Sequence, residues 1–542
     1  MDDVDRPVPG TPPGAGTASV TAALSPALTA LLPALAAWMP QRRWFVREAG
    51  EEDGCPPRLE LLAVLPLPLA PVDPGALPGT RVLLLLLRAR PGGSEEPPAA
   101  DALGGAVGGY RDYQVPLVLR PQAATGVGEP SAEQAPVPAV IGEVTVDGTP
   151  LRVIDAVEDG SGRRALLHLL TSPPAPRQKA CPGGEAPALR LVADGVRGGR
   201  GLGPVRASRL LRGEQSNSSM IFEIDGADPV ILKLFRILQG GANPDVEVQS
   251  VLDAAQCAAI APLLGAVRAV PERGLRIGTA DEADRGEDPP AVHLLLAQRF
   301  LPDVQDAWRV ALERARTGTS FRTQAHELGA ATGQVHRILA REMRSVPADA
   351  RAREQMIAGM LERLEEAARD IPQIAAQADD LRLLIQRARS GPWPPLQRIH
   401  GDYHLGQVLR TASDGWVLLD FEGEPLRPLA QRTAPDCTLR DVAGMLRSLD
   451  YAAAAVRRSD GVDARAWAED ARAAFLAGYR EVRLPEDPAG QASLLRVFEA
   501  DKAIYEALYE ARLRPDWLGI PLEALERILA QDRLSAEAAP GA

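Results

Sequence analysis

Two histidines, an aspartate and a glutamine stand together in one short run, RIHGDYHLGQVL. Their types allow either a metal site on His400 and His404 or acid–base chemistry at Asp402. Zinc is disfavoured, because no third nitrogen or sulfur ligand lies nearby in the sequence. A second carboxylate, Asp420 in VLLDFEGEP, follows Gln407 by thirteen residues. Such oxygen ligands suit Mg²⁺, so the run predicts a base beside a magnesium site, with the histidines bracing the loop through hydrogen bonds.

The spacing of these residues is similar to a pattern of protein kinases. There, H-R-D-x-x-x-x-N forms the catalytic loop and D-F-G follows after a strand. In this chain the frame is H-x-D-x-x-x-x-Q, followed by Asp420 and Phe421. By this pattern Asp402 accepts the proton of an acceptor hydroxyl, while Gln407 and Asp420 hold Mg²⁺ on nucleotide phosphates.

An upstream stretch, RLLRGEQSNSSMIFEIDGADPVILKLFR, predicts strand, polar loop, strand, turn and strand. The loop offers backbone N–H groups and small polar side chains to phosphates. We expect four of its residues to do so: Ser216, Asn217, Ser218 and Ser219. Lys233 follows in an apolar strand, where a buried ammonium is costly without an anionic partner. Only three of the 60 basic residues are lysines, which favours a specific role over a strand-edge lysine that reaches water.

The next helix supplies a candidate partner for that lysine. Asn243 is typical of an N-cap and Pro244 of a first helical position. Glu247 follows in the first turn, and a strand lysine paired with a glutamate of the next helix holds nucleotide phosphates in kinase-like folds. By itself a Lys…Glu spacing is common, so the assignment of the Lys233–Glu247 pair depends on the other motifs.

Two further segments complete the candidate site. The strand AVHLLLAQRF is placed where a hinge between lobes belongs, with backbone groups from Gln298 to Phe300 facing an adenine; the alternative is a plain strand followed by a capped helix. On a C-terminal helix, one face groups two aromatic rings with charged residues, as in sugar-binding surfaces. These residues are Lys502, Tyr505, Glu506, Tyr509 and Glu510, with Trp517 just beyond. The alternative is an amphipathic helix with core tyrosines. The helix of Glu327 and His336 is interpreted as structural.

Composition limits the class of protein. A chain of 542 residues is long enough for two to four domains. The net charge of −12 disfavours general nucleic-acid or anionic-membrane binding. Four scattered cysteines indicate free thiols in a reducing compartment. The acidic, proline-rich N-terminus has no signal-peptide pattern, and VLLLLL is too short to span a bilayer and is typical of a buried strand. We expect a cytoplasmic protein.

Strand-like patterns dominate the first part of the chain and helical patterns the last part. This order predicts an α+β fold with separate lobes. Residues 1–25 are interpreted as a disordered tail, residues 26–155 as a β-rich cap, residues 156–302 as an intermediate nucleotide-binding subdomain, and residues 303–542 as a helical lobe.

The chain resembles the bacterial maltokinases in a combination of motifs: HGDYHLGQVL, DFEGEP, the Ser-rich loop before ILKLFR, NPDVEV, QRRWF and YEARLRPDWLGIPL. That family has an aminoglycoside-phosphotransferase-like, protein-kinase-like bilobal fold and makes maltose 1-phosphate from maltose and ATP. The resemblance implies Asp402 as base, Gln407 and Asp420 as metal ligands with Glu422 close by, and Lys233 with Glu247 on the phosphates. It also implies a sugar site. Its residues would be Asp402, His404, Lys502, Tyr505, Glu506, Tyr509, Arg512 and Trp517.

One departure is that VREAGEEDG follows QRRWF, where the family has a lysine-containing segment.

From the motifs and the resemblance we expect a Mg²⁺- and ATP-dependent kinase acting on the anomeric hydroxyl of maltose. Glucosamine kinases and other small-sugar or aminoglycoside kinases share the HGD and DFEG elements, so these acceptors stay open. A kinase-shaped module without catalysis is the remaining alternative.

Overall fold

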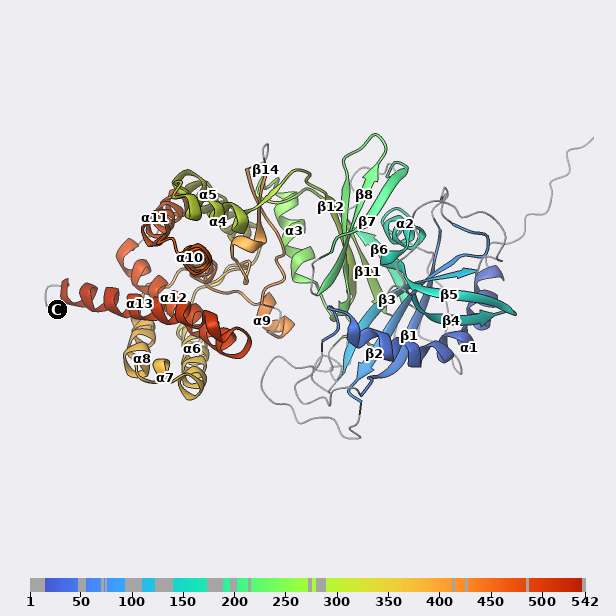
Figure 1. Ribbon diagram of the computed structural model, residues 1–542, viewed down its shortest axis with the longest axis horizontal. Coiled ribbons are helices and arrows are strands. Elements are labelled where there is room, and N and C mark those ends of the chain that lie inside the picture. Colours follow the sequence, from blue (N-terminus) through green and yellow to red (C-terminus); the bar gives the residue numbers. More distant parts are fainter. Residues whose placement is uncertain are drawn as a thin grey trace, which may run out of the picture. The chain divides into compact units, whose positions relative to one another are not determined.

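The computed structural model describes most of the chain. The described residues are 15–46, 55–69, 73, 76–92, 110–121, 140–172, 189–194, 202–212, 216–271, 275–278, 289–411, 415–424, 427–483 and 487–538. The chain divides into two compact units, residues 1–246 with 262–300 and residues 247–261 with 301–542. Figure 1 labels their elements. Of the helices described, not one combines the length and the apolar character needed to cross a bilayer.

The first unit begins with an antiparallel sheet in the order β1-β2-β3-β5-β4. Its strands are β1 (Arg58–Leu67), β2 (Arg81–Arg90), β3 (Arg111–Pro121), β4 (Val140–Val146) and β5 (Thr149–Asp155). A short strand from later in the chain, β10 (Ile237–Leu238), pairs with β3. Helix α1 (Ala15–Trp38) packs on β1 and β4 (Figure 1). This helix covers residues 15–25 of the tail that the sequence predicted to be disordered, while residues 1–14 lie outside the described residues.

The VLLLLL run is a strand buried on both faces. In β2, Leu84 and Leu86 belong to one apolar core and Leu83 and Leu85 to another. Because successive side chains of a strand point to opposite faces, such a run needs a covered sheet on both sides. The core of Leu84 and Leu86 also contains residues of the second sheet, described below, and the core of Leu83 and Leu85 contains residues of α1. The prediction of a buried strand is confirmed.

A second antiparallel sheet has the order β6-β11-β12-β9-β8-β7. Its strands are β6 (Leu189–Asp194), β7 (Val205–Leu210), β8 (Asn217–Ile224), β9 (Val230–Phe235), β11 (Leu263–Pro271) and β12 (Val292–Arg299). Strands β5, β6 and β11 were not foreseen from the sequence. Helix α2 (Gly160–His168) contributes to a core that both sheets share. The predicted cap and intermediate subdomains each hold one of these sheets, and the shared core joins them into one compact unit.

The second unit is mainly helical. Its helices are α3 (Pro244–Ala254, from Glu247 on), α4 (Ala307–Thr317), α5 (Arg322–Glu342), α6 (Ala350–Asp370), α7 (Pro372–Ala375), α8 (Ala378–Arg387), α9 (Leu429–Thr433), α10 (Leu439–Asp460), α11 (Arg465–Val482), α12 (Pro488–Leu513) and α13 (Gly519–Ala538). A small sheet joins β13 (Gln305–Asp306), β14 (Val408–Thr411) and β15 (Gly415–Leu418). The long helices predicted after residue 303 are confirmed.

Glycines bring α5 and α11 unusually close. A Cβ on Gly329 of α5 would lie 2.0 Å from the carbonyl oxygen of Phe475, and one on Gly478 of α11 would lie 2.0 Å from that of His326. Both distances are far below van der Waals contact, so only glycine allows the two backbones to approach this way. This contact fixes side chains of α5 behind the candidate site.

Candidate active site

The HGD run forms a loop that is held by its backbone. Asp441, in the first turn of α10, accepts the N–H of His400 at 2.8 Å and that of Gly401 at 2.9 Å. Gly401 has φ +87°, and a Cβ there would lie 3.1 Å from the Cα of Gly423 in the DFEG turn. The glycine of HGD is thus required both by its left-handed conformation and by its contact with that turn. These constraints fix the backbone that carries Asp402.

Asp402 presents its carboxylate to a lysine. Its side chain is 27% exposed, and its Oδ1 lies 3.8 Å from Nζ of Lys502 on α12. The same ammonium is 3.8 Å from Oε1 of Glu424. Burial acts to lower the pKa of Lys502, but the charges of Asp402, Glu424 and Glu506 raise it above its ordinary value. Lys502 is therefore an ammonium at neutral pH, next to a partly exposed carboxylate that a substrate can reach.

The two histidines serve the loop. Nε2 of His400 bonds the carbonyl oxygen of Leu419 at 2.8 Å, which couples the loop to the residue before Asp420. Nδ1 of His404 accepts the N–H of Gly406 at 3.0 Å and caps the short 3-10 helix Leu405–Gln407. Burial lowers the pKa of His404, which agrees with a neutral ring that accepts this bond. The prediction that both histidines brace the loop is confirmed, whereas a contact of His404 with a sugar stays a prediction.

The predicted metal ligands of the second unit are neighbours. Nε2 of Gln407 donates to Oδ2 of Asp420 at 3.1 Å. Asp420 itself has φ +63°, a costly conformation that aspartate tolerates better than most residues and that is frequent at functional sites. Glu422 accepts a bond from Arg432 through its backbone carbonyl at 2.9 Å. Burial lowers the pKa of Arg432, and the charges of Glu422 and Asp420 partly offset that effect. The donor set is carboxylate and amide oxygen, which fits Mg²⁺.

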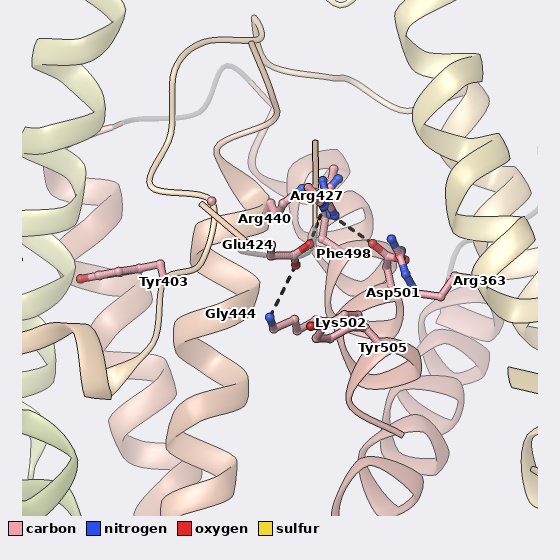
Figure 2. A pocket seen from close by; sticks show the side chains of 11 residues that line it. Arg363, Tyr403, Glu424, Arg427, Arg440, Gly444, Phe498, Asp501, Lys502 and Tyr505 are labelled. Atoms are coloured by element: carbon pink, nitrogen blue, oxygen red, sulfur yellow. Dashed lines mark hydrogen bonds and ion pairs between the residues drawn. The ribbon is translucent and has the colours of Figure 1, made fainter. Parts of the chain in front are cut away.

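Beside the loop is a small pocket, shown in Figure 2. It is lined by Arg363, Gly401, Tyr403, Glu424, Arg427, Arg440, Gly444, Phe498, Asp501, Lys502 and Tyr505. In the figure, Lys502 and Arg427 both point toward Glu424. Asp501 pairs with Arg363 and, at 3.2 Å, with Arg440. The pocket is therefore walled by paired charges, and Glu424 is its carboxylate next to Lys502.

The predicted sugar-binding face is only partly brought together. Lys502 and Tyr505 line the pocket, with Nζ of Lys502 4.9 Å from the centre of the Tyr505 ring. Glu506 instead faces α10, where Arg447 donates to its Oε2 through Nε at 2.9 Å and through Nη2 at 2.6 Å. Arg447 is 1% exposed, so this is a buried ion pair.

Three residues of that face lie outside the pocket lining. The guanidinium of Arg514 lies 5.4 Å from the ring of Tyr509 and 5.2 Å from that of Trp517. Arg512 pairs with Glu366 of α6 at 2.6 Å. A helix rises about 1.5 Å per residue, so side chains two and three turns beyond Lys502 are carried well along the axis. The prediction that Tyr509, Arg512 and Trp517 form one surface with Lys502 is not supported by this geometry.

Lys233 has a partner that the sequence did not indicate. Nζ of Lys233, on β9, contacts Oδ2 of Asp245 at 3.0 Å. Glu247 pairs with Arg398 at 3.2 Å within the second unit. Asn243 does cap α3, accepting the N–H of Asp245 at 2.9 Å. The predicted pairing of Lys233 with Glu247 stays a prediction.

The predicted polar loop is also shorter than expected. Strand β8 begins at Asn217, so Ser218 and Ser219 are buried strand residues. Oγ of Ser218 accepts a bond from Nε of Arg236 at 2.8 Å. The exposed side chain of Ser216 and the half-buried one of Asn217 remain at the end of the strand. Residues 213–215 lie outside the described residues.

The strand expected to lead into the hinge is β12, and the border between the two units follows Phe300. Gln298 is paired on both sides, with Leu263 of β11 and Ile231 of β9. The N–H of Phe300 donates to the carbonyl oxygen of Pro229 at 2.7 Å. This donor is therefore engaged within the unit, and contact of the Gln298–Phe300 backbone with an adenine stays a prediction.

Sequence reasoning missed several residues that shape the site. Asp441 and Arg447 stand on α10, about 40 residues beyond the HGD loop, and have no motif around them. Glu424 lies within the quoted DFEGEP run, where its carboxylate next to Asp420 and Glu422 was a usable signal.

Known proteins were compared with this chain. No family model matches it. A glucosamine kinase of Streptacidiphilus jiangxiensis is 32% identical over 254 residues, which are 43% of this chain and 57% of that protein. A glucosamine kinase of Mycolicibacterium smegmatis is 26% identical over 347 residues, 60% of this chain and 80% of that protein. The chain thus spans little more than half the length of the first of these relatives.

A solved structure of glucosamine kinase in complex with glucosamine, ADP and inorganic phosphate superposes with a TM-score of 0.59. It is 22% identical, and the match covers 92% of this chain and 99% of that one. A second glucosamine kinase structure gives a TM-score of 0.58 at 24% identity. This likeness shows the fold, and the predicted α+β, kinase-like fold is confirmed. The two relatives in sequence described above are both named glucosamine kinase.

Proposed function

We propose that this protein transfers the γ-phosphoryl group of ATP to a hydroxyl of a small sugar, and that the sugar is glucosamine. The observation that carries the kinase proposal is the HGD loop. Asp441 and Gly401, with its left-handed backbone, hold the loop on which Asp402 presents a partly exposed carboxylate. Gln407, five residues after Asp402, is bonded to Asp420. A positioned carboxylate next to oxygen ligands is what phosphoryl transfer requires of a protein.

In this mechanism Asp402 orients the acceptor hydroxyl and takes its proton. Lys502 is a positive charge next to that carboxylate, and we propose that it stabilises negative charge on the transferred phosphoryl group. Lys233, held by Asp245, is proposed to bind the nucleotide phosphates, and Ser216 and Asn217 to meet them at the end of β8. Mg²⁺ held by Gln407, Asp420 and Glu422 would supply charge that stabilises the phosphates.

Glucosamine is favoured as acceptor by both relatives' names and by the pocket. Burial raises the pKa of Glu424, but Lys502 and Arg427 bring it below its ordinary value, so this carboxylate is ionised at neutral pH. An ionised carboxylate beside the base is a partner for the ammonium group of an amino-sugar. A neutral disaccharide has no group that requires it.

Maltose is the second candidate. It is favoured by the YEARLRPDWLGIPL run, which begins at Tyr509 on α12. Tyr505, one turn earlier on the same helix, lines the pocket. Against it, Tyr509, Arg512 and Trp517 contact other side chains away from the pocket.

The test is ADP release from Mg-ATP by the purified protein with glucosamine, glucose, maltose and an aminoglycoside as acceptors. We expect turnover with glucosamine above all others. Turnover with maltose alone would show that the acceptor is maltose and not glucosamine, and it would leave the proposed mechanism unchanged. Binding of ATP without turnover on any acceptor would instead support a kinase-shaped module without catalysis.

Asp402→Asn tests the base in the same assay. Losing a general base costs about 10²–10⁴-fold in rate, so kcat should fall by that factor while ATP affinity by calorimetry is retained. Asp379→Asn is the matched control, because that carboxylate is fully exposed on α8. An Asp402→Asn enzyme with the parent's kcat would refute this role of Asp402.

A further inference from the structure

A buried histidine stands behind the HGD loop and has no part in the proposed chemistry. His336, on α5, is 1% exposed. Its Nε2 lies 2.9 Å from Oδ2 of Asp441, and its Nδ1 lies 3.0 Å from the hydroxyl of Tyr479 on α11. Oδ2 of Asp441 is the atom that also accepts the N–H of His400 at 2.8 Å. One carboxylate oxygen thus joins the histidine to the loop of Asp402.

The charge states fit a single hydrogen-bond order. Burial raises the pKa of Tyr479 to about 12, so its hydroxyl keeps its proton. Burial also acts to raise the pKa of Asp441, but its hydrogen bonds with Nε2 of His336 and with the N–H of Gly401 lower it below its ordinary value. Asp441 is therefore an anion that only accepts. The tyrosine hydroxyl then donates to Nδ1, and Nε2–H donates to the carboxylate.

Further contacts tie α5 to the same loop. Thr332, one turn before His336 on the same face of α5, bonds the hydroxyl of Tyr403 at 2.8 Å. The carbonyl oxygen of His336 accepts Nε2 of Gln397 at 2.7 Å, three residues before His400. The helix therefore contacts the chain on both sides of Asp402, at Gln397 and at Tyr403.

The close contact of α5 with α11 makes this arrangement rigid. Gly329 and Gly478 bring the helix backbones together, and this places the Tyr479 hydroxyl at Nδ1 of His336. Because the bonds to both ring nitrogens are buried, an unpaired nitrogen would cost free energy. The ring is thus held in one orientation.

We infer that His336 is a positioning residue for phosphoryl transfer: its Nε2–H fixes the Asp441 carboxylate, which fixes the N–H groups of His400 and Gly401 and so the direction of Asp402. This inference rests on the proposed function for its kinetic consequence, but its structural part concerns the loop alone. Its closest structural alternative is a ring that merely fills space in the helical core.

Two variants separate these possibilities. The side-chain nitrogen of Gln in His336→Gln reaches about as far as Nε2 and can donate to Asp441. In His336→Asn the amide is one methylene shorter and cannot. Both are polar amides, so they perturb the core similarly. We expect kcat to fall about 10–100-fold in His336→Asn and less than about fivefold in His336→Gln, with KM for ATP within about twofold of the parent in both.

Hydrogen–deuterium exchange of peptides that cover residues 398–406 is the second readout. We expect exchange there to be about tenfold faster in His336→Asn and near the parent's rate in His336→Gln. His326→Gln is the matched control on the same helix, because His326 pairs with Glu481 on the surface at 2.9 Å. It should leave kcat and exchange unchanged.

Equal effects of the Asn and Gln variants on kcat and exchange would overturn the inference, since they would indicate a packing role. Unchanged loop exchange in His336→Asn would overturn it as well, whether or not the protein turns over any acceptor. A parent protein that is inactive on all acceptors would refute the proposed function, while the exchange result would still decide the positioning role.

Discussion

The buried pair of Arg447 and Glu506 offers a sharp test of how the site is held. Arg447 is 1% exposed and Glu506 12% in their side chains. Arg447→Met removes both bonds that Glu506 accepts from Arg447, while Asp450 keeps Arg472 at 3.0 Å and Arg527 at 2.6 Å. Breaking a buried pair costs about 3–5 kcal/mol. Because Glu506 is slightly exposed, we expect a loss near the lower end, about 3 kcal/mol.

Glu506→Gln keeps an acceptor but not the charge, so we expect it to cost about 1–2 kcal/mol. The double variant leaves neither ion unpaired at this contact. Its cost should be smaller than the sum of the single costs by about 2 kcal/mol. Urea unfolding of the full chain, followed by far-UV circular dichroism, measures each difference from the midpoint at constant m-value.

Arg465→Met is the matched control for the arginine. Its side chain is 74% exposed and pairs with Asp463 on the surface at 2.6 Å, so the change should stay within about 0.5 kcal/mol. Additive single costs, to within about 0.5 kcal/mol, would refute the argument that the two ions depend on each other.

Three other predictions concern pH, packing and charge. Burial acts to raise the pKa of Asp450, but Arg472, Arg447 and Arg527 lower it below 3.8. Because such a group binds more protons unfolded than folded, its stabilisation is present above pH of about 4 and is lost as the pH falls further; the urea midpoint should drop there, and drop less in Asp450→Asn. Gly478→Ala places a Cβ 2.0 Å from a backbone oxygen, so it should cost about 3 kcal/mol or more and lower the Tm. Lys502→Met should reduce kcat/KM for the sugar about 100-fold and Lys502→Arg less; equal losses would show that shape, not charge, matters.

The arrangement of the HGD loop was predictable from the sequence because its residues are close together in the chain. His400, Asp402 and Gln407 lie within one run, and the chain between Gln407 and Asp420 is a hairpin of β14 and β15. A short connection leaves little choice of where these side chains meet. The same holds for the buried strand β2, whose unbroken apolar run required two covered faces.

Predictions that depended on the exact position of a residue within an element were incomplete. The sequence identified the N-cap of α3 correctly, but it did not indicate that Asp245, in the first turn, pairs with Lys233. Ser218 was likewise assigned to a loop, since nothing in SNSSM marks where strand pairing with β9 begins.

Contacts between residues far apart in the chain could not be predicted from local sequence patterns, for a physical reason. Arg447 and Glu506 are 59 residues apart, and His336 and Asp441 are 105 apart. Each pair is buried, so each partner alone would be a costly charge or polar group, and only the folded helices reveal that the costs cancel. A helix that the sequence identifies only as structural can therefore carry a residue that contacts the carboxylate holding the HGD loop. The sequence signal that remains is a histidine, His336, four residues after Thr332 on a helix. Its role becomes visible only in the structure, where Asp441 contacts both Nε2 of His336 and the backbone of the HGD loop.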